Sequence, residues 1–254
     1  MFGDNAMNKT VALFVLGLAC LWQSAAHAQL RVLYSGGFAT PYREVLPEFE
    51  KSTGLTVTST RALSQGSGSN TIPALIRGGA DVDVVVMTRE GLDELAADGR
   101  VVRETVVDLA RAPLGVAIRA GTPRPDLTTV EGFKQAVLRA HSINYVSSTG
   151  IYMAEKLFPS LGIADEAARK RNEASVDDLP KTSVDLVLRP VSEIVSIPGF
   201  EFVGPVPQEI QDVSTFSTAV VTNSKQLEAG KRLIAFLASH THDAAKRVSM
   251  QPVD

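Results

Sequence analysis

The sequence predicts an α/β protein made of two units, each a mostly parallel β-sheet flanked by helices. From residue 30 onward, short β-branched runs alternate with amphipathic stretches, and the alternation resumes after a Pro-rich segment at 113–125. Strands that alternate with helices of about 10–15 residues are typical of parallel βαβ units. The apolar run VDVVVM at 82–87 is continuous, which indicates a strand buried on both faces.

The first unit alternates strictly between strand and helix. Its expected elements are, in chain order, a strand at 30–35, a helix at 41–53, a strand at 55–60, a helix at 70–80, a strand at 82–87 and a helix at 89–99. The helix over 41–53 has the clearest signals, because Thr40 can cap it, Pro41 suits its first turn and Gly54 can end it.

The second unit repeats this order, and the chain then returns to the first. Its expected elements are a helix at 128–140, a strand at 143–147, a helix at 150–162, a strand at 184–190, a returning strand at 216–224 and one long helix at 225–248. We therefore expect one lobe over 29–112 plus 204–254 and a second lobe over 113–203. A ligand is expected between them, at the carboxyl ends of the strands.

The first 28 residues predict a secretory signal peptide. Lys9 precedes an apolar run at 10–22, and AHA at 26–28 is a small-x-small cleavage site, so cleavage is expected after Ala28. The run is shorter than the roughly 18–20 residues that a membrane span requires. A lipoprotein anchored through Cys20 is the alternative. The chain is expected to be exported to the periplasm.

Composition excludes several classes of function. Cys20 is the single cysteine and lies in the expected signal peptide, so no disulfide or thiolate chemistry is expected. The formal net charge of −3 gives no basic footprint for nucleic acid. The histidines beyond the signal peptide, His141, His240 and His242, lack metal-ligand spacing. We expect a monomer without metal or cofactor.

Three loops that follow strands and precede helices are rich in Gly, Ser and Thr: SGGFAT at 35–40, SQGSGSN at 64–70 and SSTG at 147–150. Helix N-termini carry free N–H groups and a partial positive charge, so such loops can cradle an anion. The alternative is that these residues serve only as caps and turns. The candidate ligand residues in the three loops are Ser35, Gly36, Gly37, Phe38, Ser64, Gln65, Gly66, Ser67, Ser147, Ser148, Thr149 and Gly150.

Arginines and tyrosines beside these loops extend the candidate site. Arg89 and Arg189 follow strands and present planar forks that suit a carboxylate, as Arg61 does, although a solvated surface position is the alternative for each. Tyr152 can hydrogen-bond a ligand oxygen while its ring packs against carbon. If the protein is an enzyme, the candidate proton-transfer groups are Tyr42, Tyr152 and Glu193.

Two common catalytic motifs are missing from the sequence. SQGSGS lacks the Gly-Lys-Ser/Thr ending of a nucleotide-binding phosphate loop. The chain also contains no G-x-S-x-G elbow, and its Ser-rich loops have no evident histidine partner. Hydrolase chemistry is therefore not expected.

The order of these segments resembles the molybdate-binding-like branch of bacterial extracellular solute-binding proteins, the receptors of ABC importers. The resemblance runs from RVLYSGGF at 31–38 through IRGGADVDVVVMTREGLDELAADGRVV at 76–102 to SSTGIYMAEKL at 147–157. It implies a two-lobed type II periplasmic binding fold that closes over a small anion, with Ser35, Ser64 and Ser148 at matching positions. The implied partners are that anion and a membrane permease.

The second lobe departs from that family in two places. Oxyanion receptors of the family carry a strand that ends in tyrosine followed by Thr-Asp-Ala, whereas Arg189 and Pro190 stand at the corresponding place here. Neutral donors suit a tetrahedral oxyanion and an arginine fork suits a carboxylate, so this departure argues against molybdate. The preceding helix is shortened to SVDDLPKTS and contains Pro180.

Two hypotheses follow. The segment IPGFEFVGPVPQEIQ at 197–211 resembles a sub-branch that includes proteins with aconitate isomerase activity. The first hypothesis is a receptor that binds an organic carboxylate or a molybdate-like oxyanion and closes by hinge motion. The second is an isomerase that moves an allylic proton of a tricarboxylate, which requires a base beside the substrate carbon.

Overall fold

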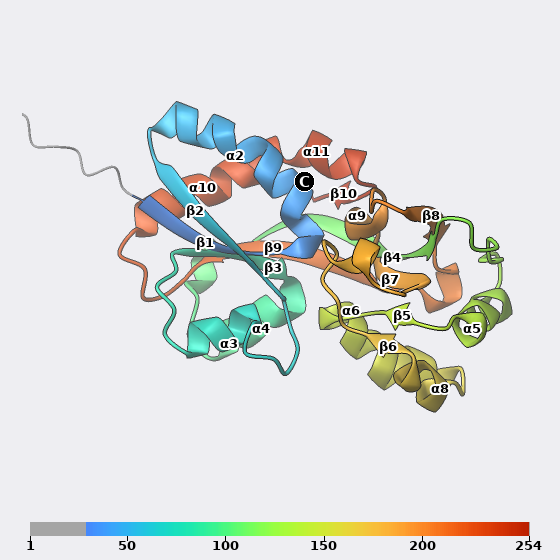
Figure 1. The fold of residues 1–254 in the computed structure, drawn as a ribbon. Coiled ribbons are helices and arrows are strands. Elements are labelled where there is room, and N and C mark those ends of the chain that lie inside the picture. Colours follow the sequence, from blue (N-terminus) through green and yellow to red (C-terminus); the bar gives the residue numbers. More distant parts are fainter. Residues whose placement is uncertain (1–28, 254) are drawn as a thin grey trace, which may run out of the picture.

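The computed structural model describes residues 29–253, so the expected signal peptide lies outside the described residues. The chain forms two lobes that share one ten-stranded mixed sheet with the strand order β2-β1-β3-β9-β4-β7-β5-β6, and β10 and β8 both pair with β4 (Figure 1). The α/β fold class is confirmed. None of the helices in this part of the chain has the length and hydropathy needed to span a membrane.

The first lobe carries helices on both faces of its half of the sheet. Strands β1, β2 and β3 run parallel, and β9 joins β3 in the antiparallel direction. Its elements are β1 (Gln29–Ser35), η1 (Gly36–Phe38), α2 (Ala39–Thr53), β2 (Thr56–Ala62), α3 (Ile72–Arg77), β3 (Val84–Thr88), α4 (Arg89–Ala97), η2 (Arg103–Thr105), β9 (Val213–Val220), α10 (Leu227–His240), α11 (His242–Arg247) and β10 (Gln251–Pro252).

The second lobe is smaller, and its two outermost strands, β5 and β6, have two residues each. Its elements are α5 (Val130–Arg139), β5 (Ile143–Asn144), α6 (Ser147–Tyr152), the π-helical turn η3 (Met153–Leu157), α7 (Phe158–Ser160), α8 (Ala164–Arg169), β6 (Arg171–Asn172), η4 (Leu179–Lys181), β7 (Leu186–Pro190), α9 (Val191–Ile194), β8 (Phe200–Pro205) and η5 (Gln208–Ile210). Strands β5, β6 and β7 run parallel, so their carboxyl ends lie at one edge.

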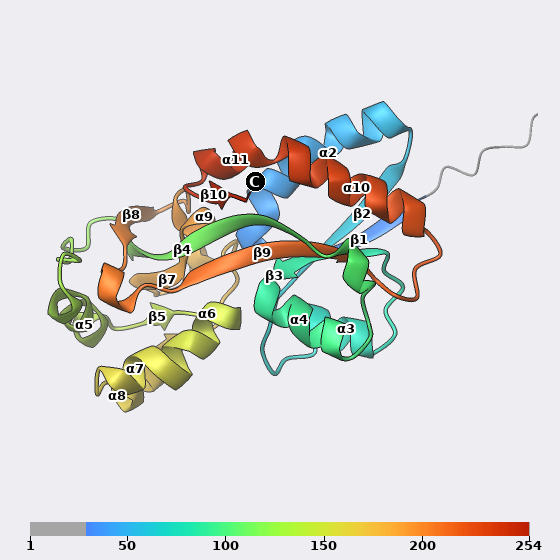
Figure 2. The ribbon, with the colours of Figure 1, turned by 180° about the vertical axis from the view of Figure 1, so that it is seen from behind.

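Strand β4 (Val107–Arg119) joins the lobes. Its first half pairs with β9 and β10, and its second half pairs with β7 and β8, so one continuous strand belongs to both halves of the sheet (Figure 2). Pro113 lies within it, and the register shifts at 108–110 and again at 116–117. The lobes are therefore linked by sheet rather than by a flexible loop.

Each lobe has apolar cores on both faces of the sheet. In the first lobe, α2, α10 and α11 cover one face and α3 and α4 cover the other (Figure 1). In the second lobe, the larger core lies under α5 to α8. Val191 of α9 packs into the core of the first lobe, and Val206 packs into that of the second. The lobe boundaries at 112–113 and 203–204 stay a prediction.

The structure corrects the bounds of three helices. Helix α2 begins at Ala39 rather than at Pro41, because the chain winds directly from η1 into it, while Gly54 ends it in the left-handed conformation as expected. The helix expected from Gly150 already begins at Ser147. The long C-terminal helix is broken at Thr241, whose hydroxyl donates to the carbonyl of Leu237 and starts a separate helix, α11.

Candidate functional site

The carboxyl ends of strands from both lobes face each other across a cleft. A cavity of about 310 Å³ lies there, lined from the first lobe by Ser35, Gly36, Arg61, Ala62, Leu63 and Asn70 and from the second by Val146, Ser147, Glu173, Ala174, Ser175, Val176, Asp177, Arg189 and Glu193. A neighbouring cavity of about 290 Å³ shares Gly36, Arg61, Asp177 and Glu193 with it. Strand ends of two α/β units are the common place for a ligand site.

The first expected loop contributes two of its four candidates to this cavity. Ser35 and Gly36 line it, while Gly37 is buried against the ring of Phe216, and its carbonyl oxygen accepts a hydrogen bond from the Ser192 hydroxyl at 2.7 Å. Phe38 lies in the core, where its ring stacks on that of Phe216. The loop therefore presents a hydroxyl and bare backbone to the cleft and buries its aromatic residue behind them.

Gly36 also makes room for Arg61 at the end of β2. A Cβ placed on Gly36 would lie 2.5 Å from a terminal nitrogen of the Arg61 guanidinium. The guanidinium thus covers the backbone of the first loop, where it adds a full positive charge beside the free N–H groups of a helix start. It forms an ion pair with Asp177 of the second lobe at 3.0 Å.

In the second expected loop, Ser64 has a structural role and the three residues after it line a cavity. The buried hydroxyl of Ser64 accepts a hydrogen bond from the backbone N–H of Thr88 at 3.1 Å, which fixes the loop to β3. Gln65, Gly66 and Ser67 line a third cavity of about 460 Å³ at the other side of the lobe contact. The N–H of Gln65 donates to the Ser147 hydroxyl at 3.2 Å, so this loop touches the second lobe.

The third expected loop is the first turn of α6. Ser147 has a φ of 57°, a left-handed conformation that costs a non-glycine residue energy and is found at functional sites. It lines the first and third cavities, and Gly150 lines the third. The Ser148 hydroxyl instead donates to that of Thr88 at 3.4 Å, and Thr149 is buried. One turn later the helix widens into the π-helical turn η3, a feature that is frequent near binding sites.

Arg189 forms the floor of the cavity on the second lobe. It donates to the side-chain oxygen of Asn144 at 2.7 Å, to the carbonyl of Ala174 at 3.0 Å and to the carboxylate of Glu193 at 2.8 Å. The Arg189 and Glu193 side chains are only 5% and 10% exposed. The second oxygen of Glu193 has no hydrogen-bond partner within residues 29–253, and Glu193 lines both cavities.

Three candidates lie away from the cavity. Arg89 forms ion pairs with Asp93 and Asp108, each at 2.9 Å, and stands on the first turn of α4. Tyr42 is fully buried in the first lobe, where its phenol hydrogen-bonds the Ser59 hydroxyl and burial raises its pKa. The Tyr152 phenol donates to the carbonyl of Ile210, and burial raises its pKa as well. None of these three residues lines either cleft cavity, and their roles in ligand binding or catalysis stay predictions.

Sequence reasoning missed the segment 173–177, which supplies five residues of the cavity wall. It follows β6, a strand of two residues that pairs in parallel with β5, so it occupies the same strand-end position as the expected loops. No hydrophobic run marks so short a strand. The signal that could have found this segment is its polar composition after the helix that ends near residue 169.

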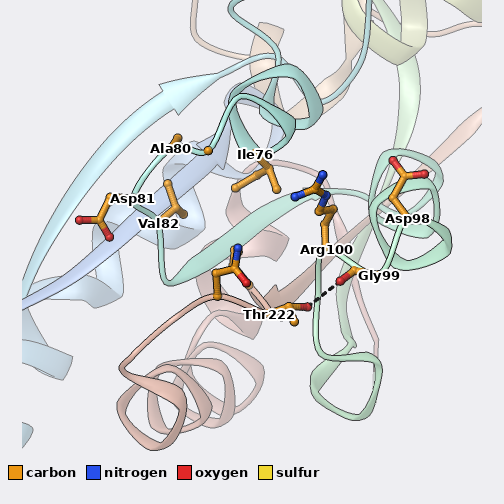
Figure 3. A pocket seen from close by; sticks show the side chains of 11 residues that line it. Ile76, Ala80, Asp81, Val82, Asp98, Gly99, Arg100 and Thr222 are labelled. Carbon is orange, nitrogen blue, oxygen red and sulfur yellow. Dashed lines mark hydrogen bonds between the residues drawn. The ribbon is translucent and has the colours of Figure 1, made fainter.

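The cleft offers hydroxyls and two arginines, which suit an anion, although Asp177 and Glu193 of the same cavity pair with these arginines. Among residues 29–253, no group of three His, Cys, Asp or Glu side chains is arranged to hold a metal ion. A separate hollow of about 420 Å³ lies at the opposite ends of the first-lobe strands, where Ile76, Val82, Arg100 and Thr222 surround it and the Thr222 hydroxyl donates to the Gly99 carbonyl (Figure 3). None of the three loops reaches that hollow.

The two-lobed fold, with a cavity lined by both lobes at their strand ends, is that of a solute-binding protein. The model of the family described as bacterial extracellular solute-binding protein matches residues 30–248, and the chain belongs to this family. It is also 33% identical over 246 residues to an aconitate isomerase of a Pseudomonas species, which covers 94% of this chain and 93% of that protein.

Solved structures support the fold. The periplasmic molybdate-binding protein of Azotobacter vinelandii matches with a TM-score of 0.69 and 17% identity, over 89% of this chain and 100% of that chain. The binding protein AgtB of Agrobacterium tumefaciens, in complex with agropinic acid, matches with a TM-score of 0.66 and 14% identity, over 89% and 83%. These likenesses confirm the expected two-lobed periplasmic binding fold.

Proposed function

We propose that the cleft binds a small polycarboxylate anion of the tricarboxylic acid class, and that the protein acts as the periplasmic receptor of an ABC importer. The observation that carries this proposal is the placement of Arg61 and Arg189 on opposite lobes, at the wall of one cavity, together with the hydroxyls of Ser35 and Ser147. Arg61 can bond a ligand carboxylate directly, whereas Arg189 adds positive charge from the opposite lobe while its three nitrogens donate to Asn144, Ala174 and Glu193.

The arginines favour a carboxylate over a tetrahedral metal oxyanion. A guanidinium presents parallel N–H groups that match the two oxygens of a carboxylate, whereas a symmetric oxyanion is satisfied by neutral donors around it. The relative with aconitate isomerase activity acts on an acid of this class, which supports the same ligand chemistry. The family and the two-lobed fold support a receptor that closes on its ligand.

The experiment is a thermal-shift screen of the purified protein, followed by calorimetric titration. The test compounds are citrate, cis-aconitate and trans-aconitate, and molybdate, tungstate, sulfate and phosphate serve as the competing class. A ligand at about 100 times its Kd stabilises the folded state by about 2.7 kcal/mol, which raises the melting temperature by several degrees. A shift with molybdate or tungstate alone would contradict the proposal.

Catalysis is a second candidate function, favoured by Glu193 and by the aconitate isomerase relative. Glu193 lines the cavity with one carboxylate oxygen bound to Arg189 and the other unbound within the described residues. Such a group can take a proton from the CH₂ carbon of an aconitate, whose electron pair spreads over the allylic carbons and a carboxylate. The same proton then returns to the other allylic carbon, so no further reactant is needed.

The second function has its own test. An isomerase converts cis-aconitate into trans-aconitate at catalytic concentration, which an ultraviolet absorbance assay follows, whereas a receptor binds both acids without turnover. Glu193→Gln keeps the shape of the side chain and the hydrogen bond to Arg189 but removes the base. We expect this variant to bind the acids and to show no conversion.

A further inference from the structure

Two arginines at the cleft, and Arg171 of the third cavity, are each paired with a carboxylate of the protein itself. Arg61 pairs with Asp177 at 3.0 Å, Arg189 with Glu193 at 2.8 Å, and Arg171 with Glu173 at 3.0 Å. A polycarboxylate that enters the cleft brings negative charge to a place where protein carboxylates already neutralise these arginines. Arg61 bonds Asp177 through one terminal nitrogen, so a ligand carboxylate that takes both terminal nitrogens of Arg61 must displace Asp177.

The three pairs differ in how easily they can open. Arg189 and Glu193 are buried, and Arg189 has two further fixed partners in Asn144 and Ala174. Arg171 lies over the ring of Tyr145 and donates to its carbonyl oxygen, so packing holds it in place. In the Arg61 pair the Asp177 side chain is 77% exposed, and its carboxylate has no other hydrogen-bond partner in the part of the chain that the structure describes.

Asp177 is also the carboxylate placed where a ligand would reach Arg61. It lines both the cavity of about 310 Å³ and that of about 290 Å³, as Arg61 does. It comes from the second lobe, 116 residues away in sequence from its partner on the first. The carboxylate therefore joins the lobes at the cleft and can turn toward solvent when another anion replaces it.

We propose that Asp177 is an internal competitor that occupies the carboxylate subsite at Arg61 until a carboxylate of the ligand displaces it. This inference rests on the proposed function, because it assumes that the cleft binds a polycarboxylate. When a ligand carboxylate replaces Asp177, Arg61 exchanges one ion pair for another. The net binding energy must therefore come from the other contacts of the ligand. Asp177 thereby selects for ligands whose other carboxylates and hydroxyls also find partners in the cleft.

The test is the Kd of cis-aconitate, measured by calorimetric titration for the wild-type protein and for Asp177→Asn. Removal of the competing charge should tighten binding about two- to fivefold, the factor that corresponds to an exposed ion pair. Asp178→Asn is the matched control: it removes the same charge one residue away, from a carboxylate that bonds Ser175 and Lys181 and does not line the cavity. Its Kd should stay at the wild-type value.

A double-mutant cycle with Arg61→Gln completes the test. That variant should bind at least about tenfold more weakly, and Asp177→Asn should have no further effect in its background, because the competed group is gone. Weaker or unchanged binding by Asp177→Asn, or an equal gain by Asp178→Asn, would overturn the inference while leaving the proposed function intact. Failure of the wild-type protein to bind any polycarboxylate would instead overturn the proposed function.

Discussion

Arg61 and Arg189 stand at equivalent places on the two lobes, since each lies at the end of a strand and lines the same cavity. Their surroundings are opposite. The Arg189 side chain is 5% exposed and has three fixed partners, whereas that of Arg61 is 27% exposed and bonds a single carboxylate that is itself exposed. The same residue type is thus part of the folded core in one lobe and available for exchange in the other.

The difference follows from the cost of burying charge. A buried guanidinium needs a partner for its charge and for its N–H groups, and Asn144, Ala174 and Glu193 supply them. An arginine at the surface loses little when it changes partners, because water screens the charge. We therefore expect Arg61 of the first lobe to supply most of the binding energy for a ligand carboxylate. Arg189 of the second lobe is expected mainly to hold the cavity wall in place.

The largest expected effect comes from removing the buried arginine. Arg189→Met leaves the carboxylate of Glu193 and the amide of Asn144 without their partner in a buried place, so the free energy of unfolding should fall by about 3–5 kcal/mol. Urea denaturation measures it. The double variant Arg189→Met, Glu193→Leu should recover much of this loss, because no charge is then left buried. A loss below about 1 kcal/mol in the single variant would show that Arg189 is not a structural residue.

Removal of the exposed arginine should act on binding and leave stability nearly unchanged. Arg61→Gln loses a charge-assisted hydrogen bond to the ligand, which corresponds to about 1.5–3 kcal/mol, or roughly 10–100-fold in Kd. Its free energy of unfolding should change by less than about 1 kcal/mol. Arg77→Gln, which removes an exposed arginine of the same lobe from its ion pair with Asp98, serves as the control in the titration. Equal effects of the two variants on affinity would show that Arg61 does not bind the ligand directly.

The serines of the first and third loops should differ in their effect on ligand affinity. Ser35→Ala removes a hydroxyl that lines the main cavity and should weaken tricarboxylate binding by about 1–2 kcal/mol. Ser148→Ala removes a hydroxyl that bonds Thr88 at the lobe contact and should weaken binding less. Calorimetric titration of both variants measures the difference. A larger loss of affinity in Ser148→Ala than in Ser35→Ala would indicate that the anion binds closer to Ser148 than to the main cavity.

A small effect on stability is expected from Asp212, a carboxylate that forms no ion pair with an arginine within residues 29–253. Burial raises the pKa of Asp212, and nearby Lys156 offsets this in part. A carboxyl whose pKa is raised by folding stabilises the folded state below its ordinary pKa, and that contribution is lost as pH rises through the raised value. Asp212→Asn should therefore increase the free energy of unfolding by about 0.5 kcal/mol or less at about pH 7 and have no effect at about pH 3. If Asp212→Asn stabilised the protein equally at both pH values, burial of the charged carboxylate would not be the reason.

The sequence predicted most of the fold because each strand and helix of the first lobe carries its own periodicity. Five of its candidate residues, Ser35, Gly36, Ser147, Arg189 and Glu193, line the cavity, and their roles stay a prediction. Arg89 shows what such reasoning cannot see: it follows a strand, yet Asp93 on the next turn of α4 holds its side chain. The wall at 173–177 was missed because a strand of two residues has no periodicity to detect.

The close contact between Gly36 and Arg61 has a consequence for the sequences of related proteins. The three atoms nearest to a methyl group at this position belong to the Arg61 guanidinium, so we expect Gly36→Ala to turn the guanidinium away from the loop and to leave the fold intact. Positions 36 and 61 should therefore change together as lineages diverge. Under the proposed function, a relative that keeps glycine at the first position and arginine at the second should keep an arginine for a ligand carboxylate, and one that loses both should lack it.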